Sequence, residues 1–281
     1  MKKLLLVTVI FAVLFSFSCH RTGKKVPQGI VVLSPEVAEI ICALDAENDI
    51  TGITAECNYP PSLKGKKSVG SFSGIDTEAI ISLNPKHIFC SALEQEKIAS
   101  DLKNLGYPVE IIYPKNISEM LSDIEKIGML IDRKEQATQL IQRLKQETAS
   151  IQENAKNKTR PKVYLEIYRN PLMSVSDSSF AGELIETAGG NNIFTTLERD
   201  YARVKSEDVI TANPDIIICY SQDTLENIIN RKGWQNIPAI KNRRIYFEKD
   251  INPDLIQRAT PRCIEGMKEL ARIFDSWRKE Q

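Results

Sequence analysis

A segment of the chain occurs twice, at residues 77–90 and again at residues 206–219. The copies align without a gap and share Glu, Ile, Asn, Pro, Ile and Cys at one constant offset, beginning with Glu78 and Glu207. Each copy reads as a short helix with an acidic first turn, an Asn-Pro stop and an apolar run typical of a buried strand. The proline disfavours helical geometry at the asparagine before it, so each helix should end there. The repeat predicts two similar α/β units, and a chance match between two common patterns is the alternative.

Strands and helices alternate on both sides of the repeated segments. This alternation predicts mostly parallel sheets that are covered by helices on both faces. We assign residues 30–115 to a first lobe and residues 159–281 to a second lobe. In the second lobe we expect residues 169–179 and 191–205 to be loops. A cleft between two such lobes is where small ligands usually bind.

The segment between the lobes, residues 116–158, contains one glycine, Gly128, and no proline. It is charged, rich in glutamine, and has apolar residues at helical spacing, so we predict helix throughout with a joint near Asp132. A free coiled-coil dimer is the alternative, but the apolar stripe lacks the several regular heptads that it would need. We therefore expect a helix laid across both lobes, which would restrict their relative movement.

The first residues have the layout of an export signal. Two lysines precede the uncharged, largely apolar run Leu4–Phe17, which is short for a membrane span. We predict a signal peptide over residues 1–18 and lipidation of Cys19, because the residues before Cys19 resemble the lipobox of bacterial lipoproteins. Residues 19–29 would then be a polar, basic tether. The protein is expected to be exported and lipid-anchored, in the periplasm or at the cell surface, and an ordinary cleavage site with a spare thiol is the alternative.

Charge and histidine content weigh against several function classes. Lys plus Arg and Asp plus Glu balance at 37 each, so no net field favours nucleic acid. The two histidines, His20 and His87, argue against a His-based triad or a His-rich metal site, and we expect no catalytic residue, metal or cofactor. An exported enzyme and a structural surface lipoprotein remain as rivals. Thermal stabilisation by a ligand would separate a binding protein from the structural class.

The cysteines leave the disulfide pattern open. Six occur in the chain: Cys19, Cys42, Cys57, Cys90, Cys219 and Cys263. If Cys19 is lipidated, an odd number remains and at least one thiol is free. Cys90 and Cys219 end apolar strands and are expected to be buried. A disulfide among the other three stays an alternative.

Five segments carry a family resemblance in this order along the mature chain: Ile30–Pro35 leading into Glu39-Ile40, Cys57–Pro61, Gly74–Pro85, Gly189–Phe194 and Arg258–Arg262. They resemble the helical-backbone substrate-binding lipoproteins of ABC importers, which carry cobalamin, haem or ferric siderophores. The Asn-Tyr-Pro-Pro and Arg-Ala-Thr-Pro-Arg segments are most similar to the cobalamin-binding members. The resemblance implies two Rossmann-like lobes bridged by a long helix, as in class III periplasmic binding proteins. It also implies a monomer that delivers one ligand to a membrane permease without chemistry.

The resemblance also implies a ligand site. The family's ligand positions fall here on Tyr59, Phe72, Met173, Tyr201 and Asp254. We expect all five in loops that follow strands and face the cleft, where aromatic faces suit a flat macrocycle. Phe72 and Tyr201 replace tryptophans, and Ser91 stands where another aromatic residue is expected. The pocket therefore has less aromatic area than the cobalamin pattern, and a corrinoid, haem or a ferric siderophore all remain candidate ligands.

Glu78 and Glu207 receive a separate role from the resemblance, because the family docks one surface glutamate of each lobe on arginines of a dimeric permease. Their equivalence in the repeat lets two pseudo-symmetric lobes present one acid each to a two-fold partner. The alternative is that each acid only complements the N-terminus of its helix.

Overall fold

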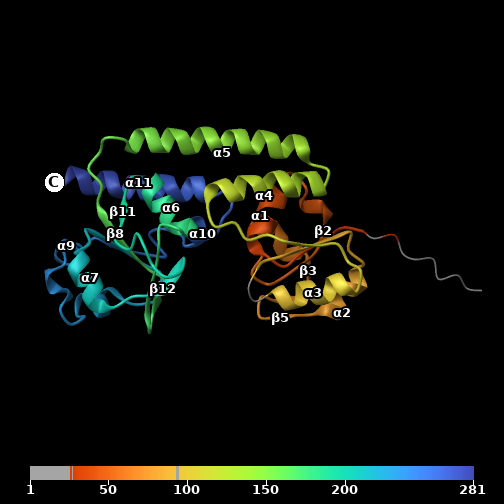
Figure 1. The fold of residues 1–281 in the computed structure, drawn as a ribbon, viewed down its shortest axis with the longest axis horizontal. Helices are drawn as coiled ribbons and strands as arrows, with labels where there is room; N and C mark the ends of the chain where they lie inside the picture. The colour runs from red at the N-terminus through yellow and green to blue at the C-terminus, as the bar shows by residue number, and fades with distance from the viewer. Residues whose placement is uncertain (1–25, 27, 93–94) are drawn as a thin grey trace, which may run out of the picture.

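The computed structural model describes residue 26, residues 28–92 and residues 95–281. The predicted signal peptide, the predicted lipidation at Cys19 and most of the predicted tether lie outside these residues. Among the helices that are described, none is both long enough and apolar enough to cross a membrane. Two α/β lobes lie side by side, and one long helix runs along an edge of both (Figure 1).

The first lobe is built on a five-stranded parallel sheet in the order β3-β2-β1-β6-β7. Its strands are β1 (Ile30–Val32), β2 (Ile50–Ile53), β3 (Lys67–Ser68), β6 (His87–Cys90) and β7 (Val109–Ile111). The other elements are α1 (Pro35–Ala43), η1 (Glu47–Asp49), η2 (Pro61–Gly65), α2 (Thr77–Leu83), α3 (Glu96–Asn104) and a hairpin of β4 (Gly70–Ser71) and β5 (Gly74–Ile75). The central strands are apolar because both faces of the sheet are covered.

The second lobe repeats this plan with a four-stranded parallel sheet in the order β11-β8-β13-β14. Its strands are β8 (Lys162–Glu166), β11 (Asn191–Asn192), β13 (Ile216–Cys219) and β14 (Ile245–Phe247). Its helices are α6 (Phe180–Thr187), α7 (Ser206–Ala212), α8 (Leu225–Ile229), η4 (Trp234–Asn236), α9 (Pro238–Lys241), α10 (Asp254–Gln257) and α11 (Cys263–Lys279). The predicted α/β class with mostly parallel sheets is confirmed.

A second sheet in this lobe overturns one expectation. The strands β9 (Tyr168–Arg169), β10 (Leu172–Val175) and β12 (Tyr201–Arg203) form an antiparallel sheet in the order β12-β10-β9. They occupy parts of the two segments that were expected to be loops. Strands this short carry little periodicity of their own, and their stability comes from pairing with residues that are distant in the sequence.

The two copies of the repeat fold alike. Helices α2 and α7 end at Asn84 and Asn213, which adopt the same left-handed conformation, with φ and ψ of 47° and 58° and of 55° and 63°. Asparagine tolerates this conformation better than most residues with a side chain. Each helix is followed by an interior strand of its sheet, β6 or β13, which has a neighbour on both sides. The predicted helix ends are therefore confirmed.

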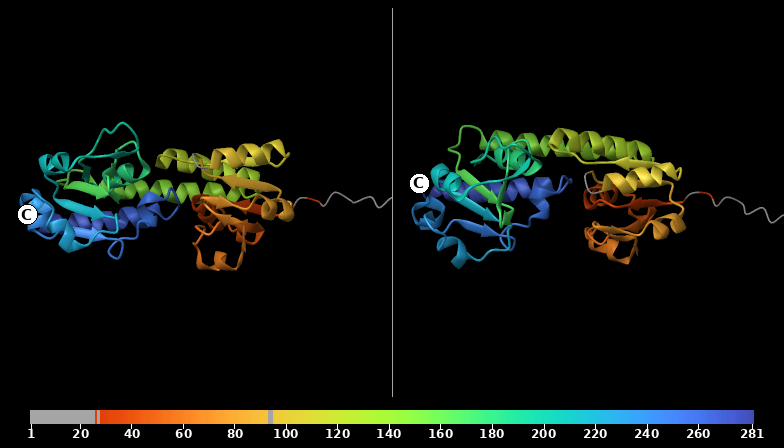
Figure 2. Two further views of the ribbon diagram at one scale, coloured as in Figure 1. Left: turned by 90° about the horizontal axis from the view of Figure 1, so that it is seen from below. Right: turned by 60° about the horizontal axis from the view of Figure 1, so that its bottom comes forward.

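The segment between the lobes forms a helical hairpin rather than one bridge. Helix α4 (Ile117–Leu130) and helix α5 (Lys134–Ala155) pack against each other, and the chain reverses at Asp132, which has a φ of 58°. The predicted joint is therefore a reversal of direction. Helix α4 packs on α1 of the first lobe, whereas α5 also packs on α11 and α6 of the second lobe. Figure 2 shows that α5 alone spans both lobes.

One apolar core runs under this hairpin and through both lobes. It contains buried side chains from α1, α4, α5, α6 and α11, including Ile41, Ile124, Leu144 and Phe274. A smaller apolar cluster fills the outer part of each lobe. Because close-packed side chains resist sliding, this shared core limits the movement of one lobe relative to the other.

The cysteines of the described residues are all free thiols: Cys42, Cys57, Cys90, Cys219 and Cys263. Cys90 and Cys219 are buried, as predicted for the ends of apolar strands. Burial raises the pKa of the Cys57 thiol to about 11, so this thiol stays protonated and unreactive near neutral pH.

Candidate ligand site between the lobes

A cavity of about 50 Å³ lies where the two lobes meet. From the first lobe it is lined by Glu36, Ser91, Ile112, Tyr113, Pro114 and Lys115, and from the second by Ser179, Phe180, Asp200, Tyr201, Gln257 and Ala259. The residues from the first lobe follow the carboxyl ends of β1, β6 and β7. Open α/β sheets bind ligands at these ends.

Tyr201 is the predicted ligand residue that lines this cavity. Burial raises its pKa, and the neighbouring Tyr113 adds to this effect. Beside it, the Lys115 ammonium and the Asp200 carboxylate form an ion pair of 3.8 Å between the lobes. Their side chains are 55% and 28% exposed, and ion pairs of this kind contribute roughly 0–1 kcal/mol. The lobes are therefore joined only weakly at this contact.

Met173 lies on the same antiparallel sheet as Tyr201. Tyr201 pairs with Val175, and Met173 is two residues before Val175, so the side chains of Met173 and Tyr201 project from one face of this sheet. The prediction that both residues are in loops is wrong, because they belong to β10 and β12. Asp254 was also expected in a loop and is instead the first residue of α10.

A buried carboxylate joins the lobes at a second place. Glu39 of α1 has a side chain that is 3% exposed and accepts two hydrogen bonds of 2.7 Å from the Arg262 guanidinium of the second lobe. Arg258 Nη1 lies 3.4 Å from the same carboxylate. Burying a carboxylate is costly unless it is paired and hydrogen-bonded, and here two arginines satisfy it.

Both arginines also hold predicted ligand residues. The Arg262 guanidinium lies 3.6 Å above the centre of the Tyr59 ring, and Arg258 Nε lies 3.1 Å from an oxygen of Asp254. We call Glu39, Arg258, Arg262, Tyr59 and Asp254 the Glu39 network. It connects Tyr59 in the first lobe to Asp254 in the second through continuous polar contacts.

Tyr59 lines a hollow of about 460 Å³ together with residues of α1, α5 and α11, and it does not line the 50 Å³ cavity. Phe72 lies at the tip of the β4–β5 hairpin, where its backbone N–H donates to Glu56 at 2.9 Å. The structure thus brings Met173 and Tyr201 together on one sheet, joins Tyr59 to Asp254 through arginines, and places Phe72 on a separate hairpin. A further hollow of about 750 Å³ along α5 and α11 contains none of these five residues.

Glu78 and Glu207 are exposed in the first turns of α2 and α7. Both helices lie on the side of their lobe away from α5, near the lower edge of the molecule in Figure 1. This arrangement is compatible with one partner surface that contacts both lobes.

Sequence reasoning missed Tyr113 and the roles of Glu39 and Arg262 in the junction. Glu39 did carry a signal, since it is an acid among the apolar residues Val37, Ile40 and Ile41 of one helix. A carboxylate at such a position must find a partner when the helix is buried. The partner could not be read from the sequence, because Arg262 is 223 residues away.

Comparison with known proteins identifies the family of the chain. A family model described as periplasmic binding protein matches residues 30–251. An uncharacterized ABC transporter substrate-binding lipoprotein of Bacillus subtilis, YvrC, is 30% identical over 89% of this chain and 81% of its own. A vitamin B12-binding protein of Vibrio parahaemolyticus is 22% identical over 94% and 96%. The periplasmic haem-binding protein RhuT from Roseiflexus, 20% identical, matches the fold with a TM-score of 0.79 over 90% of this chain and 99% of its own.

The fold and the junction define a two-lobed binding protein of the α/β class. The chain belongs to the periplasmic binding protein family. The resemblance stated from the sequence motifs is therefore confirmed at the level of the family.

Proposed function

We propose that this protein is the substrate-binding component of an ABC importer and captures a corrinoid or a ferric chelate between its lobes. The observation that carries this proposal is that Tyr201 and Tyr113 line the cavity at the junction of two parallel-sheet lobes, with Met173 on the same sheet face as Tyr201. Aromatic and thioether side chains suit the apolar faces of a macrocycle. The relatives named above include vitamin B12-binding and haem-binding proteins, so haem or a siderophore is the alternative ligand within the same function.

The two contacts between the lobes suggest how the ligand enters. Ligand pockets measure roughly 300–1,000 Å³, so a cavity of about 50 Å³ is too small to hold a macrocycle. Entry therefore requires side chains at the exposed Lys115–Asp200 contact to separate. The Glu39 carboxylate is buried, and its pairing with Arg262 and Arg258 holds the lobes together meanwhile. The shared core under α5 limits how far the lobes part.

We further propose that the protein is exported as a monomer and anchored through lipidated Cys19, with Glu78 and Glu207 docking on the permease. Support comes from the resemblance to binding lipoproteins and from the equivalent, exposed positions of the two acids. Tyr59, Phe72 and Asp254 are proposed as additional ligand contacts. Tyr59 and Asp254 are partly exposed, so both could contact the ligand while the arginines stay paired with Glu39.

The test is a titration of the purified protein with cobalamin, cobinamide, haem and ferric siderophores, followed by visible absorption and by the melting temperature. We expect one class of ligand to bind tightly and to raise the melting temperature, since a ligand at one hundred times its dissociation constant stabilises by about 2.7 kcal/mol. Binding of none of these compounds, together with a hydrolytic activity that copurifies, would contradict the proposal and favour an exported enzyme.

A further inference from the structure

The antiparallel sheet β12-β10-β9 has two faces with different surroundings. Pairing places Met173 opposite both Arg203 of β12 and Tyr168 of β9, and it places Val175 opposite Tyr201. Residues directly opposite each other in an antiparallel pair share a face. One face therefore carries Tyr168, Met173, Val175, Tyr201 and Arg203, which we call the Met173 face.

The opposite face is turned into the second lobe. Its Ser174 hydroxyl donates to the Leu165 carbonyl of β8 at 2.7 Å, and its Leu172 packs against the outer core of the lobe. On the same face, Arg169 forms an ion pair of 3.0 Å with Asp223, whose side chain is fully buried. The Met173 face is buried at Val175, in the shared core, and looks outward at Tyr168 and Arg203. Tyr201, opposite Val175, lines the cavity with residues of the first lobe.

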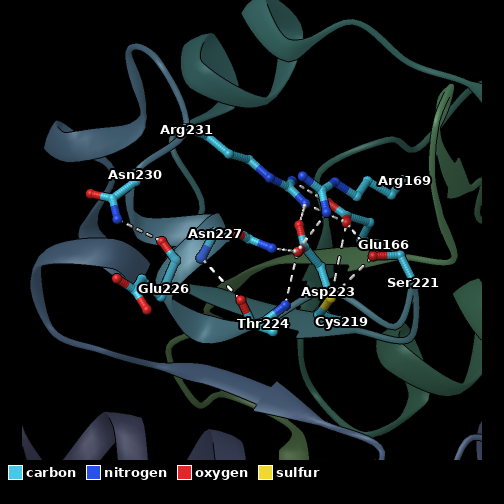
Figure 3. Close-up of polar contacts among 10 residues, drawn as sticks. All are labelled: Glu166, Arg169, Cys219, Ser221, Asp223, Thr224, Glu226, Asn227, Asn230 and Arg231. Carbon is cyan, nitrogen blue, oxygen red and sulfur yellow. Dashed lines mark hydrogen bonds and ion pairs between the residues drawn. The ribbon is translucent and has the colours of Figure 1, made fainter.

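A polar cluster fixes the β9–β10 hairpin in this orientation (Figure 3). Asp223 accepts from Arg169, from Arg231 at 2.8 Å and from Asn227 at 2.8 Å. Arg231 also binds both oxygens of the fully buried Glu166 at the end of β8. Satisfied buried networks of this kind are rigid, so the hairpin presents its outer face in one defined position.

Two side chains of the Met173 face are displayed without a partner of their own. Tyr168 is 55% exposed, and Arg203 is exposed and makes no hydrogen bond or ion pair within the part of the chain that the structure describes. They lie on either side of Met173, on the same surface as Tyr201. An aromatic ring and a free guanidinium on a fixed surface are the groups that bind a flat ring system and an oxyanion.

We propose that Tyr168 and Arg203 extend the ligand site beyond the positions implied by the family, with Tyr168 covering the macrocycle and Arg203 binding an anionic substituent of it. This inference rests on the proposed function. The substituent is an oxyanion, either a phosphodiester, as in the nucleotide arm of cobalamin, or a carboxylate, as in haem. Tyr168 also offsets the aromatic area that is missing at Ser91.

The test compares matched pairs of probes. Dissociation constants are measured for cobalamin against cobinamide, which lacks the phosphodiester, and for haem against its dimethyl ester, which lacks the free carboxylates. The proteins are the wild type, Arg203→Gln, Tyr168→Ala and Tyr168→Phe. Arg243→Gln is the control, because Arg243 is an exposed arginine just before β14, at the opposite end of the parallel sheet from the cavity.

For whichever pair of probes binds, we expect Arg203→Gln to weaken binding of the anionic member by about tenfold. Binding of the other member should weaken by less than about twofold. Weaker cobalamin binding would identify the phosphodiester, and weaker haem binding the carboxylate. Tyr168→Ala should weaken both members by about tenfold, and Tyr168→Phe should restore them. If Arg203→Gln and Tyr168→Ala keep wild-type affinity, or if Arg203→Gln weakens both members of a pair equally, this inference is overturned. The proposed function would stand in either case. A wild type that binds none of the four probes would overturn the macrocycle proposal and this inference with it.

Discussion

At the scale of single residues, the junction between the lobes depends on where charge is buried. Glu39 contributes one carboxylate to two arginines from the other lobe, and both arginines in turn contact predicted ligand residues. Its neighbours in the first lobe supply no other cation to this carboxylate among the described residues. Removing it would leave the Arg262 guanidinium nearly buried without a counter-charge, whereas Arg258 would keep its ion pair with Asp254. Leaving one charge of a buried pair unpartnered is the costly way to break that pair.

We therefore predict that Glu39→Ala lowers the free energy of unfolding by about 3–5 kcal/mol. Urea unfolding followed by circular dichroism measures this change. Asp101→Ala serves as the control, because its ion pair with Lys97 is exposed and should contribute little. Equal stability of the two variants would show that the Glu39 network does not hold the lobes together.

At the scale of elements, the sequence predicts what depends on local pattern and misses what depends on distant pairing. The ends of α2 and α7 follow from one Asn-Pro dipeptide in each copy. The antiparallel sheet was missed because its strands pair with residues that are distant in the sequence, as Met173 does with Arg203. The same limit applies to the site. Tyr201 was predicted to face the cleft, but Tyr113, which lines the same cavity from the other lobe, was not predicted.

The reversal between α4 and α5 depends on one glycine at their contact. A Cβ atom at Gly128 would lie 2.5 Å from the Cβ of Ala137 and 3.1 Å from the Arg133 carbonyl oxygen. Alanine usually favours a helix over glycine by about 1 kcal/mol, so the two effects oppose each other. Because the obstacle includes backbone, we expect the clash to prevail.

Gly128→Ala is thus predicted to destabilise the protein by roughly 1–3 kcal/mol in urea unfolding, despite the gain in helix propensity. Gly65→Ala is the matched control, since an added Cβ there has no atom within 4 Å and should leave stability nearly unchanged. A Gly128→Ala variant that is more stable than the wild type would show that the helices of the hairpin are not closely packed at this point.

At the scale of the whole molecule, the equivalent helices α2 and α7 lie on the side of the protein away from α5 (Figure 1), and each carries one acid of the repeat in its first turn. Glu78 and Glu207 are exposed in corresponding turns, so a two-fold symmetric permease could contact both at once. Neither acid lines the cavity between the lobes. Ligand binding and docking should therefore be separable by mutation.

We predict that Glu78→Lys combined with Glu207→Lys slows ligand uptake by roughly tenfold or more, because like charges would then face the permease arginines and oppose both encounter and register. One reversal alone should have a smaller effect, since exposed ion pairs contribute roughly 0.2–1 kcal/mol each. Uptake is measured in vesicles that carry the cognate importer, alongside ligand affinity of the free protein. Glu125→Lys combined with Glu135→Lys makes the same change of charge on α4 and α5, away from the proposed docking side, and should transport normally. Normal uptake by the first double variant would reduce these acids to helix-end charges, and a loss of ligand affinity would place them in the ligand site instead.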